Sequence, residues 1–324
     1  MLIYLEQHAK EYPLTKKILS RFSDSSVVEI QHYKNVFDKK IGYPTEKCLI
    51  LAKSDRLKLF PVPENYGYPD CKAFFFVTQL NCIFDCAYCY LKGAFKNDFP
   101  VIFVNYSDIQ EELRRKIIEL RDEWYKGKIV FYASNYSDLV GMESLSWFHQ
   151  SFIPFFEQFD NVLMETRTKS GNIQSLLDLD IIPQNTEIAF SLNPQAIIES
   201  YEHWSSSLKS RISAIKTLQA KWWKVGLRFL PLLPVPGYVE IYEQFLRELC
   251  QEIDINNVNS IFLATLIYNK QDWITIQKKE SEFKLLKDLE VDEDGLVRVS
   301  ATDREVFDWL FRKYFGDRVV RDYV

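Results

Sequence analysis

Short apolar runs alternate with amphipathic segments through the middle of the chain, from about residue 72 to residue 266. The runs have the length and composition of strands in a buried parallel sheet, and the segments between them carry apolar residues at helical spacing. This alternation predicts an α/β protein with a parallel sheet, open or closed into a partial barrel. The predicted strands are residues 73–77, 128–133, 161–166, 187–192, 226–232 and 260–266, and the predicted helices between them are residues 108–125, 144–159, 173–179, 207–221 and 238–252.

The two flanks of this region follow a different pattern. The N-terminal flank combines short strands with one helix and ends in an irregular, proline-rich stretch. After residue 267 the alternation stops, and a charged stretch, a hairpin around Asp294 and Gly295 and a final helix follow. We therefore expect an N-terminal α/β extension over 1–70, a central region over 71–267 and a small C-terminal region over 268–324. The elements expected in the flanks are strands at 2–5, 27–30 and 48–52 and helices at 14–22 and 303–314.

Three of the six cysteines lie within eight residues, directly after the first strand of the central region. Cys82, Cys86 and Cys89 have the spacing C-x3-C-x2-C. Three thiolates on one loop can hold three corners of a cubane [4Fe–4S] cluster and leave the fourth iron open to another ligand. The alternative is a structural zinc site in a non-catalytic metal-binding protein. Zinc needs a fourth ligand, and Cys71 is the nearest candidate.

With this loop placed after the first strand of an α/β region, the sequence resembles the radical S-adenosylmethionine (SAM) superfamily. The resemblance implies a partial (β/α)6 TIM-like barrel and a [4Fe–4S] cluster whose open iron is chelated by SAM. It also implies an enzyme that cleaves SAM reductively to a 5′-deoxyadenosyl radical for hydrogen abstraction, with a reductant such as flavodoxin or ferredoxin as partner.

A narrower resemblance is to the spore photoproduct lyase family, a family of DNA-repair lyases. It runs from residue 1 to about residue 266 and fades in the tail. The motifs that carry it are Tyr4, Glu6, Glu11-Tyr12-Pro13-Leu14, Phe22, Cys86-x-Tyr88-Cys89-Tyr90-Leu91, Ser137-Asp138-Leu139-Val140-Gly141, Thr168-Lys169 and Phe190-Ser191-Leu192-Asn193.

The family resemblance implies a role for each of these polar residues. Cys82, Cys86 and Cys89 would bind the cluster. Tyr88 would approach the adenosyl group of SAM, and Tyr90 would lie beside the radical path; in the family this pair is implicated in returning a hydrogen atom to regenerate SAM. The residues placed where the family contacts SAM are Tyr88, Ser137, Lys169, Ser191 and Asn193, with Arg211 nearby.

Each assignment also has a structural alternative. Tyr88 and Tyr90 could be packing residues in a chain with 18 tyrosines. Lys169 could be a solvated lysine, and Ser191 and Asn193 could belong to a strand end and a turn.

One position of the family pattern is changed. Three residues before Asp138, where the family has the cysteine that supplies a hydrogen atom to the repaired thymine radical, this chain has Asn135. An amide N–H is much stronger than a thiol S–H, so Asn135 is a poor hydrogen-atom donor. The chain therefore uses another donor, with Tyr136, Tyr88, Tyr90 and Cys71 as candidates, or it performs a different reaction.

The distribution of charge is a second departure from the family pattern. The chain has 40 Lys and Arg against 45 Asp and Glu, a net charge of −5, which excludes a generally basic nucleic-acid-binding protein. The family has a basic DNA-binding hairpin in the region of residues 270–295. In this chain the region carries five Lys and eight acidic residues, so it would repel phosphate groups. The stretch from Leu208 to Arg228 has six basic residues, no acid and Trp222-Trp223, which suits either a nucleic-acid face or a solvated helix and a buried aromatic pair.

The sequence thus predicts a cytoplasmic radical SAM enzyme. No signal peptide or apolar run long enough for a membrane span is visible. The substrate predicted from the resemblance is a damaged or modified DNA base. The alternative is a peptide or small metabolite on the same scaffold.

Overall fold

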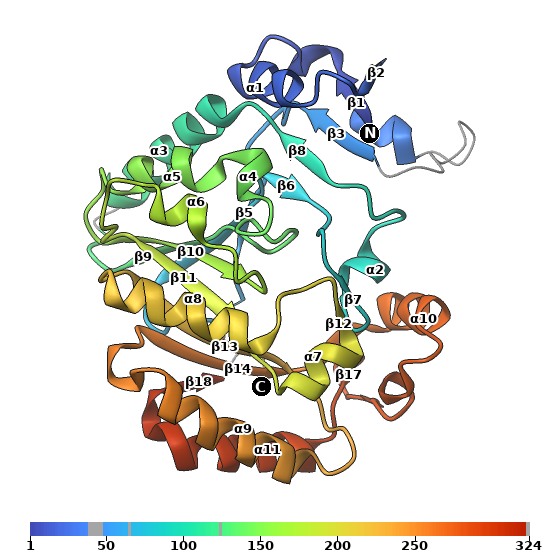
Figure 1. Ribbon diagram of the computed structural model, residues 1–324, viewed down its shortest axis with the longest axis vertical. Helices are drawn as coiled ribbons and strands as arrows, with labels where there is room; N and C mark the ends of the chain where they lie inside the picture. The colour runs from blue at the N-terminus through green and yellow to red at the C-terminus, as the bar shows by residue number, and fades with distance from the viewer. Residues whose placement is uncertain (38–47, 64–65, 123–124, 322–324) are drawn as a thin grey trace.

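The computed structural model describes residues 1–37, 48–63, 66–122 and 125–321 (Figure 1). Parts of the predicted N-terminal extension, of the helix over 108–125 and of the C-terminal region therefore lie outside the described residues. At the centre is a curled sheet with the edge strands β18 (Val319–Arg321) and β4 (Leu59–Pro61), in the order β18-β14-β13-β11-β10-β9-β5-β4. All six predicted strands are present and parallel: β5 (Lys72–Phe76), β9 (Ile129–Tyr132), β10 (Val162–Thr168), β11 (Thr186–Ser191), β13 (Lys224–Leu232) and β14 (Ser260–Thr265). The predicted partial barrel is confirmed.

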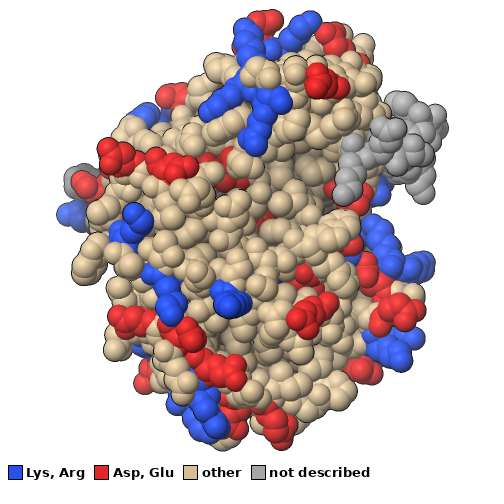
Figure 2. Space-filling view, in the orientation of Figure 1, with Lys and Arg blue, Asp and Glu red and all other residues tan. Residues whose placement is uncertain are grey.

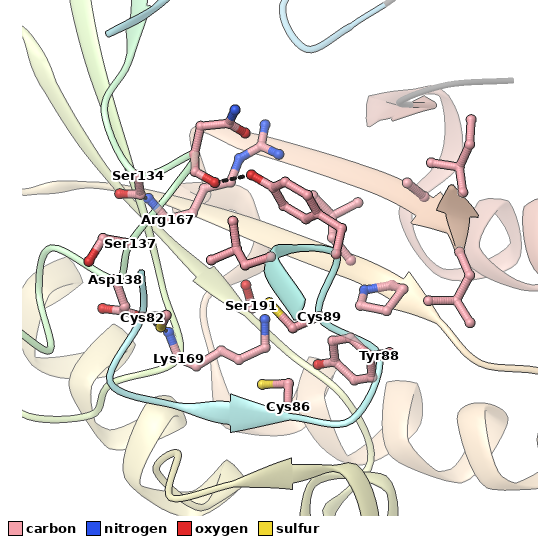
Figure 3. A pocket seen from close by; sticks show the side chains of 18 of the residues that line it. Cys82, Cys86, Tyr88, Cys89, Ser134, Ser137, Asp138, Arg167, Lys169 and Ser191 are labelled. Atoms are coloured by element: carbon pink, nitrogen blue, oxygen red, sulfur yellow. Dashed lines mark hydrogen bonds between the residues drawn. The ribbon is translucent and has the colours of Figure 1, made fainter. Parts of the chain in front are cut away.

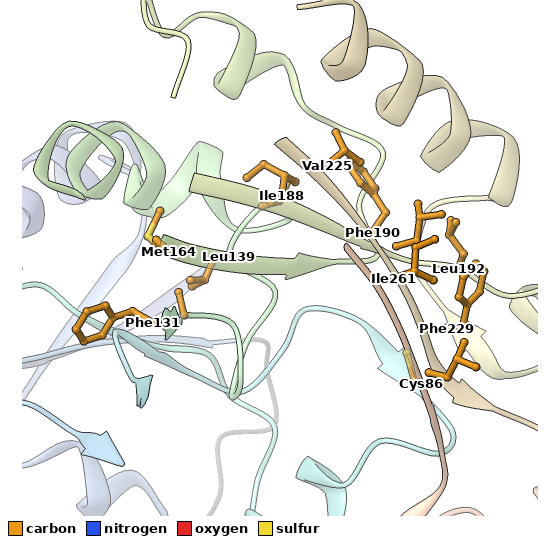
Figure 4. Packing of buried hydrophobic residues seen from close by; sticks show 14 of the residues in the cluster. Cys86, Phe131, Leu139, Met164, Ile188, Phe190, Leu192, Val225, Phe229 and Ile261 are labelled. Carbon is orange, nitrogen blue, oxygen red and sulfur yellow. The ribbon is translucent and has the colours of Figure 1, made fainter. Parts of the chain in front are cut away.

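Helices cover the outer face of this sheet, where side chains on alternate strand positions are apolar. Met164, Ile188 and Phe190 belong to the buried layer between sheet and helices, part of which Figure 4 shows. The helices that follow the strands are α3 (Tyr106–Asp122), α5 (Phe148–Phe156), α6 (Gln174–Leu177), α8 (Leu208–Ala220) and α9 (Tyr238–Glu252).

The helix predicted over 144–159 is interrupted. It consists of α4 (Glu143–Ser146) and α5, separated by Trp147 in the left-handed conformation with φ 48°. The Glu143 carboxylate accepts hydrogen bonds from the backbone N–H groups of His149 at 2.8 Å and Gln150 at 3.2 Å. These bonds cap the start of α5 and stabilise a break that the apolar periodicity does not reveal.

The inner face of the barrel is polar, because the positions that alternate with the apolar ones include charged residues. Arg228 is fully buried and donates to Glu165 and to Glu187, each at 2.6 Å. Its guanidinium also lies 3.9 Å from the Phe262 ring centroid. This network fills the interior between β10, β11 and β13.

The N-terminal sheet has the order β2-β1-β3-β8-β6. The strands predicted in the first 70 residues are present as β1 (Leu2–Glu6), β2 (Ser26–Ile30) and β3 (Cys48–Ala52), and the predicted helix is α1 (Pro13–Arg21). Two strands from beyond residue 70, β6 (Gln79–Leu80) and β8 (Val101–Phe103), complete it. The sheet thus extends past the expected boundary and connects the extension with the cysteine loop.

The C-terminal region packs back on the barrel. Its final helix, α11 (Ala301–Phe315), lies beside α9, and β18 (Val319–Arg321) adds a parallel strand next to β14 (Figure 1). The predicted hairpin is β16 (Glu290–Val291) and β17 (Leu296–Arg298), with Gly295 at φ 80°, and β17 also pairs with β15 (Ile267–Asn269). The helix α10 (Lys270–Lys279) was not predicted. Within the described ranges, no helix is both long and apolar enough to cross a membrane.

Candidate active site

The cysteine loop follows β5 and runs along one wall of a cavity of about 470 Å³. Cys82 precedes the short strand β7 (Asp85–Cys86), and Cys89 precedes the helix α2 (Leu91–Ala94). β7 pairs with β12 (Glu202–His203), in the register Cys86 to Glu202. All three cysteines line the cavity (Figure 3), so the loop brings the three predicted cluster ligands to one place.

Cys86 is buried and Cys82 and Cys89 are partly buried, and desolvation disfavours the thiolate form of all three. Burial raises the pKa of Cys86 to about 12, and it also raises the pKa values of Cys82 and Cys89. Ligation by a cluster requires thiolates, so cluster assembly releases protons here. In the part of the chain that the structure describes, no three His, Cys, Asp or Glu side chains converge as ligands of a single ion.

Cys71 lies apart from this loop. It precedes the first residue of β5, and its Sγ donates to the Tyr68 carbonyl oxygen at 3.1 Å. It is not among the residues that line the cavity. The structure therefore gives no support to Cys71 as a fourth zinc ligand or as a hydrogen-atom donor.

Polar side chains from the next strand ends reach the cysteine end of the cavity. Ser137 and Asp138 follow β9, and Lys169 follows β10. The Asp138 carboxylate accepts hydrogen bonds from the N–H groups of Gly141 at 2.8 Å and Lys169 at 2.7 Å and from the Thr168 hydroxyl at 2.8 Å. Asp138 thus fixes the loop after β9 to the end of β10.

The Lys169 side chain extends among the three cysteines (Figure 3). Burial alone would lower the pKa of Lys169, but the Glu202 carboxylate together with Cys86 and Cys89 outweighs burial, and the pKa is raised. Lys169 is therefore a cation at neutral pH, placed among the three cysteines. Ser191, at the end of β11, lines the same part of the cavity.

Tyr88 is held by a buried network behind the cavity wall. Its hydroxyl donates to Glu202, which also accepts from Asn193 at 2.9 Å and from Arg211 at 2.5 Å. Burial would raise the pKa of Glu202, but Arg211 and Lys169 hold it below its usual value. The phenolic proton of Tyr88 therefore points to an ionised carboxylate.

Asn193 and Arg211 belong to this supporting network and do not line the cavity. The Asn193 side chain accepts from Tyr242 at 2.9 Å, and Arg211 donates to the Ser191 carbonyl oxygen at 2.8 Å. Arg211 thus positions Ser191, and Asn193 positions Tyr88 through their shared partner Glu202.

Tyr90 and Asn135 meet at the cavity. The Tyr90 hydroxyl donates to the backbone carbonyl oxygen of Asn135, and both residues line the cavity. Tyr136 is not one of the lining residues; its ring packs 5.8 Å from Phe95 and 6.5 Å from Tyr90, centroid to centroid. Of the donors considered from the sequence, only Tyr88 and Tyr90 reach the cavity.

Sequence reasoning missed several residues of this site. Glu165 and Arg167 on β10 line the cavity, as does Lys169 just after the strand. Because every second residue of a strand points to the same face, the position of Lys169 could have indicated that residues 167 and 165 also face the cavity. Glu202 was missed because its link to the cavity is its bond to Tyr88, which lies 114 residues away in the sequence. The aromatic lining residues Tyr66, Phe75, Tyr132 and Tyr268 were missed as well.

The barrel and the loop of three cysteines after its first strand define a radical SAM protein. Its family follows from sequence comparison: the spore photoproduct lyase family model matches residues 1–294. The chain belongs to the spore photoproduct lyase family, and the match extends beyond residue 266, where the resemblance was expected to fade.

Individual relatives agree with this assignment. The chain is 24% identical over 258 residues to a spore photoproduct lyase of Geobacillus sp. (strain Y412MC61), covering 78% of this chain and 74% of the relative. It is 25% identical over 267 residues to that of Bacillus subtilis (strain 168), covering 76% and 72%.

Solved structures show the same fold. One is a spore photoproduct lyase complexed with dinucleoside spore photoproduct, with a TM-score of 0.82 and 20% identity over 99% of this chain and 98% of that chain. A second, a variant with bound AdoMet (SAM) and dinucleoside spore photoproduct, has a TM-score of 0.81 and 21% identity, with the same coverage.

Proposed function

We propose that this chain binds a [4Fe–4S] cluster and SAM in the cavity and acts on a thymine photoproduct of the spore photoproduct type in DNA. The observation that carries the proposal is the placement of the three cysteines of one loop, Lys169 and the tyrosine pair around one cavity. The donor set fits the cluster, because three thiols of one loop leave one iron without a protein ligand. When bound and reduced by a carrier such as flavodoxin or ferredoxin, the cluster and SAM supply a carbon-centred radical for hydrogen abstraction.

The residues of the chain have distinct parts in this proposal. Cys82, Cys86 and Cys89 hold the cluster. The Lys169 ammonium pairs with the SAM carboxylate, and Ser137 and Ser191 offer hydroxyls to the same end of SAM. Tyr88, oriented by Glu202, lies along the wall toward the adenosyl group.

The Lys169→Gln substitution is expected to weaken SAM binding about 10- to 100-fold, because it removes a charge-assisted hydrogen bond from a buried site. Equilibrium dialysis with labelled SAM on the anaerobically reconstituted protein measures the effect. Lys216→Gln is the matched control, because Lys216 pairs with Glu252 on the surface at 3.0 Å. Equal SAM affinity in the Lys169 variant and the control would contradict the assignment.

DNA binding is expected to be weak and sensitive to salt. The acidic hairpin has one arginine, and it is paired within the hairpin: Arg298 pairs with Asp292 at 3.0 Å and with Asp294 at 2.7 Å.

On the face in Figure 2, basic and acidic residues are mixed, with a basic group at the end over α1, which carries Lys16, Lys17 and Arg21. Trp222 is exposed at the start of β13, the end opposite the cavity, whereas Trp223 is buried.

Fluorescence anisotropy with a labelled duplex over a range of salt concentrations tests this expectation. The affinity should be low even at low salt and should fall further as salt rises, because each of the few phosphate contacts releases counterions and so weakens with salt. Tight binding to undamaged duplex at physiological salt would contradict it.

A further inference from the structure

The cavity has two ends of different chemistry. The cysteines, Lys169 and Ser191 form one end, which the proposed function assigns to the cluster and SAM. Arg167 lies at the opposite end (Figure 3). Three aromatic side chains that line the cavity lie at this end: Tyr66 and Tyr132 pack against Arg167, and Phe75 packs against both rings. Within the proposed function, this end is the space left for the substrate.

Arg167 is held in a fixed orientation. Its Nε donates to Glu165 at 2.6 Å, and its guanidinium carbon lies 4.9 Å from the Tyr66 ring centroid and 5.3 Å from that of Tyr132. The side chain nevertheless keeps 20% of its surface exposed. A planar guanidinium fixed by a carboxylate and two rings presents its donors in one direction with little loss of side-chain entropy.

The charges around Arg167 are balanced. Glu165 and Glu187 carry two negative charges, and Arg167 and Arg228 carry two positive charges, within one connected network. A phosphate would require an excess of positive charge at this end of the cavity, whereas a neutral acceptor would not. Carbonyl oxygens of a nucleobase are neutral acceptors that arginine binds well, and aromatic side chains bind the base face.

We propose that this end of the cavity is a nucleobase subsite, in which Arg167 donates to a carbonyl oxygen of a pyrimidine and the rings of Tyr66, Phe75 and Tyr132 form the apolar wall. The inference rests on the proposed function and names the substrate group that the site recognises: the base and not the phosphodiester.

Binding to the reconstituted protein with SAM tests the subsite. The probes are dinucleoside spore photoproduct, which lacks a phosphate, the corresponding dinucleotide, which has one, and undamaged dithymidine dinucleotide. Arg167→Gln should weaken both photoproduct ligands by a similar factor of about 10 to 100. Arg167→Lys keeps the charge beside Glu165 but loses the planar fork, and it should weaken both as well.

Arg114→Gln is the matched control, because Arg114 lies on the surface near Phe155 and Phe159, and it should bind both ligands like the wild type. Iron content and circular dichroism establish that each variant is folded. If Arg167→Gln does not fold, Arg167→Lys alone decides, because it retains a cation for Glu165.

The outcomes separate the subsite from the proposed function. Wild-type affinity in both Arg167 variants would overturn the subsite, and so would a loss confined to the phosphate-bearing ligand. If the wild type binds undamaged dithymidine dinucleotide through Arg167 but neither photoproduct, the subsite stands and the photoproduct substrate is wrong. Failure to bind any of the three probes would overturn the subsite.

Discussion

The Cys86→Ala substitution is expected to reduce SAM cleavage to the level seen without protein and to lower the iron content of the reconstituted chain. Cys86 is buried, lines the cavity and is fixed by the pairing of β7 with β12. With two thiols left on the loop, the cubane lacks a third corner, and among the described residues that line the cavity Cys82 and Cys89 are the only other cysteines. Iron analysis, the absorbance of the cluster and chromatography of 5′-deoxyadenosine measure the effect.

Cys250→Ala is the matched control, because Cys250 is a half-buried free cysteine on α9, away from the cavity. It should keep the wild-type iron content and SAM cleavage. A Cys86→Ala protein that still binds four irons and still cleaves SAM would show that the cluster lies elsewhere.

The second large effect concerns Asn135. The wild-type chain is expected to turn dinucleotide spore photoproduct into abortive side products instead of repairing it cleanly, because the described cavity lining holds no thiol besides the three cysteines proposed to bind the cluster. Asn135→Cys should convert this into clean repair to thymidines with less SAM consumed for each repaired photoproduct. The Tyr90 hydroxyl donates to the backbone carbonyl oxygen of residue 135, so the substitution changes the side chain without removing this hydrogen bond.

Asn135→Ser is the control, because serine is similar in size to cysteine but has a strong O–H bond and therefore donates hydrogen atoms poorly. It should behave like the wild type. Product analysis by mass spectrometry, with the ratio of 5′-deoxyadenosine to repaired product, distinguishes the three proteins. Clean repair by the wild type would show that Tyr88, Tyr90 or another group already supplies the hydrogen atom.

The sequence predicted the barrel because its strands are buried on the outer face against helices, which leaves a strong apolar pattern. Residues such as Ile188 and Phe190 on β11 carry that pattern. The cysteine loop was found from its spacing alone. The structure brings Tyr88, Tyr90, Asn135, Ser137, Lys169 and Ser191 to the cavity wall with the three cysteines.

The buried ionic networks were not predictable from local pattern. Glu165 and Arg228 are 63 residues apart, and Tyr88 and Glu202 are 114 residues apart. The residues next to each of these groups in the sequence do not include its partner. The pair forms only when the strands come together in the folded sheet. For the same reason Asn193, expected near SAM, is found behind the wall with Glu202 and Tyr242.

The most direct test of the account is reductive SAM cleavage by the wild-type chain. The protein is reconstituted anaerobically with iron and sulfide, supplied with SAM and dithionite, and examined for 5′-deoxyadenosine and methionine. The account predicts one [4Fe–4S] cluster per chain and formation of 5′-deoxyadenosine that depends on both reductant and protein. A chain that binds four irons but yields no 5′-deoxyadenosine from SAM would contradict it.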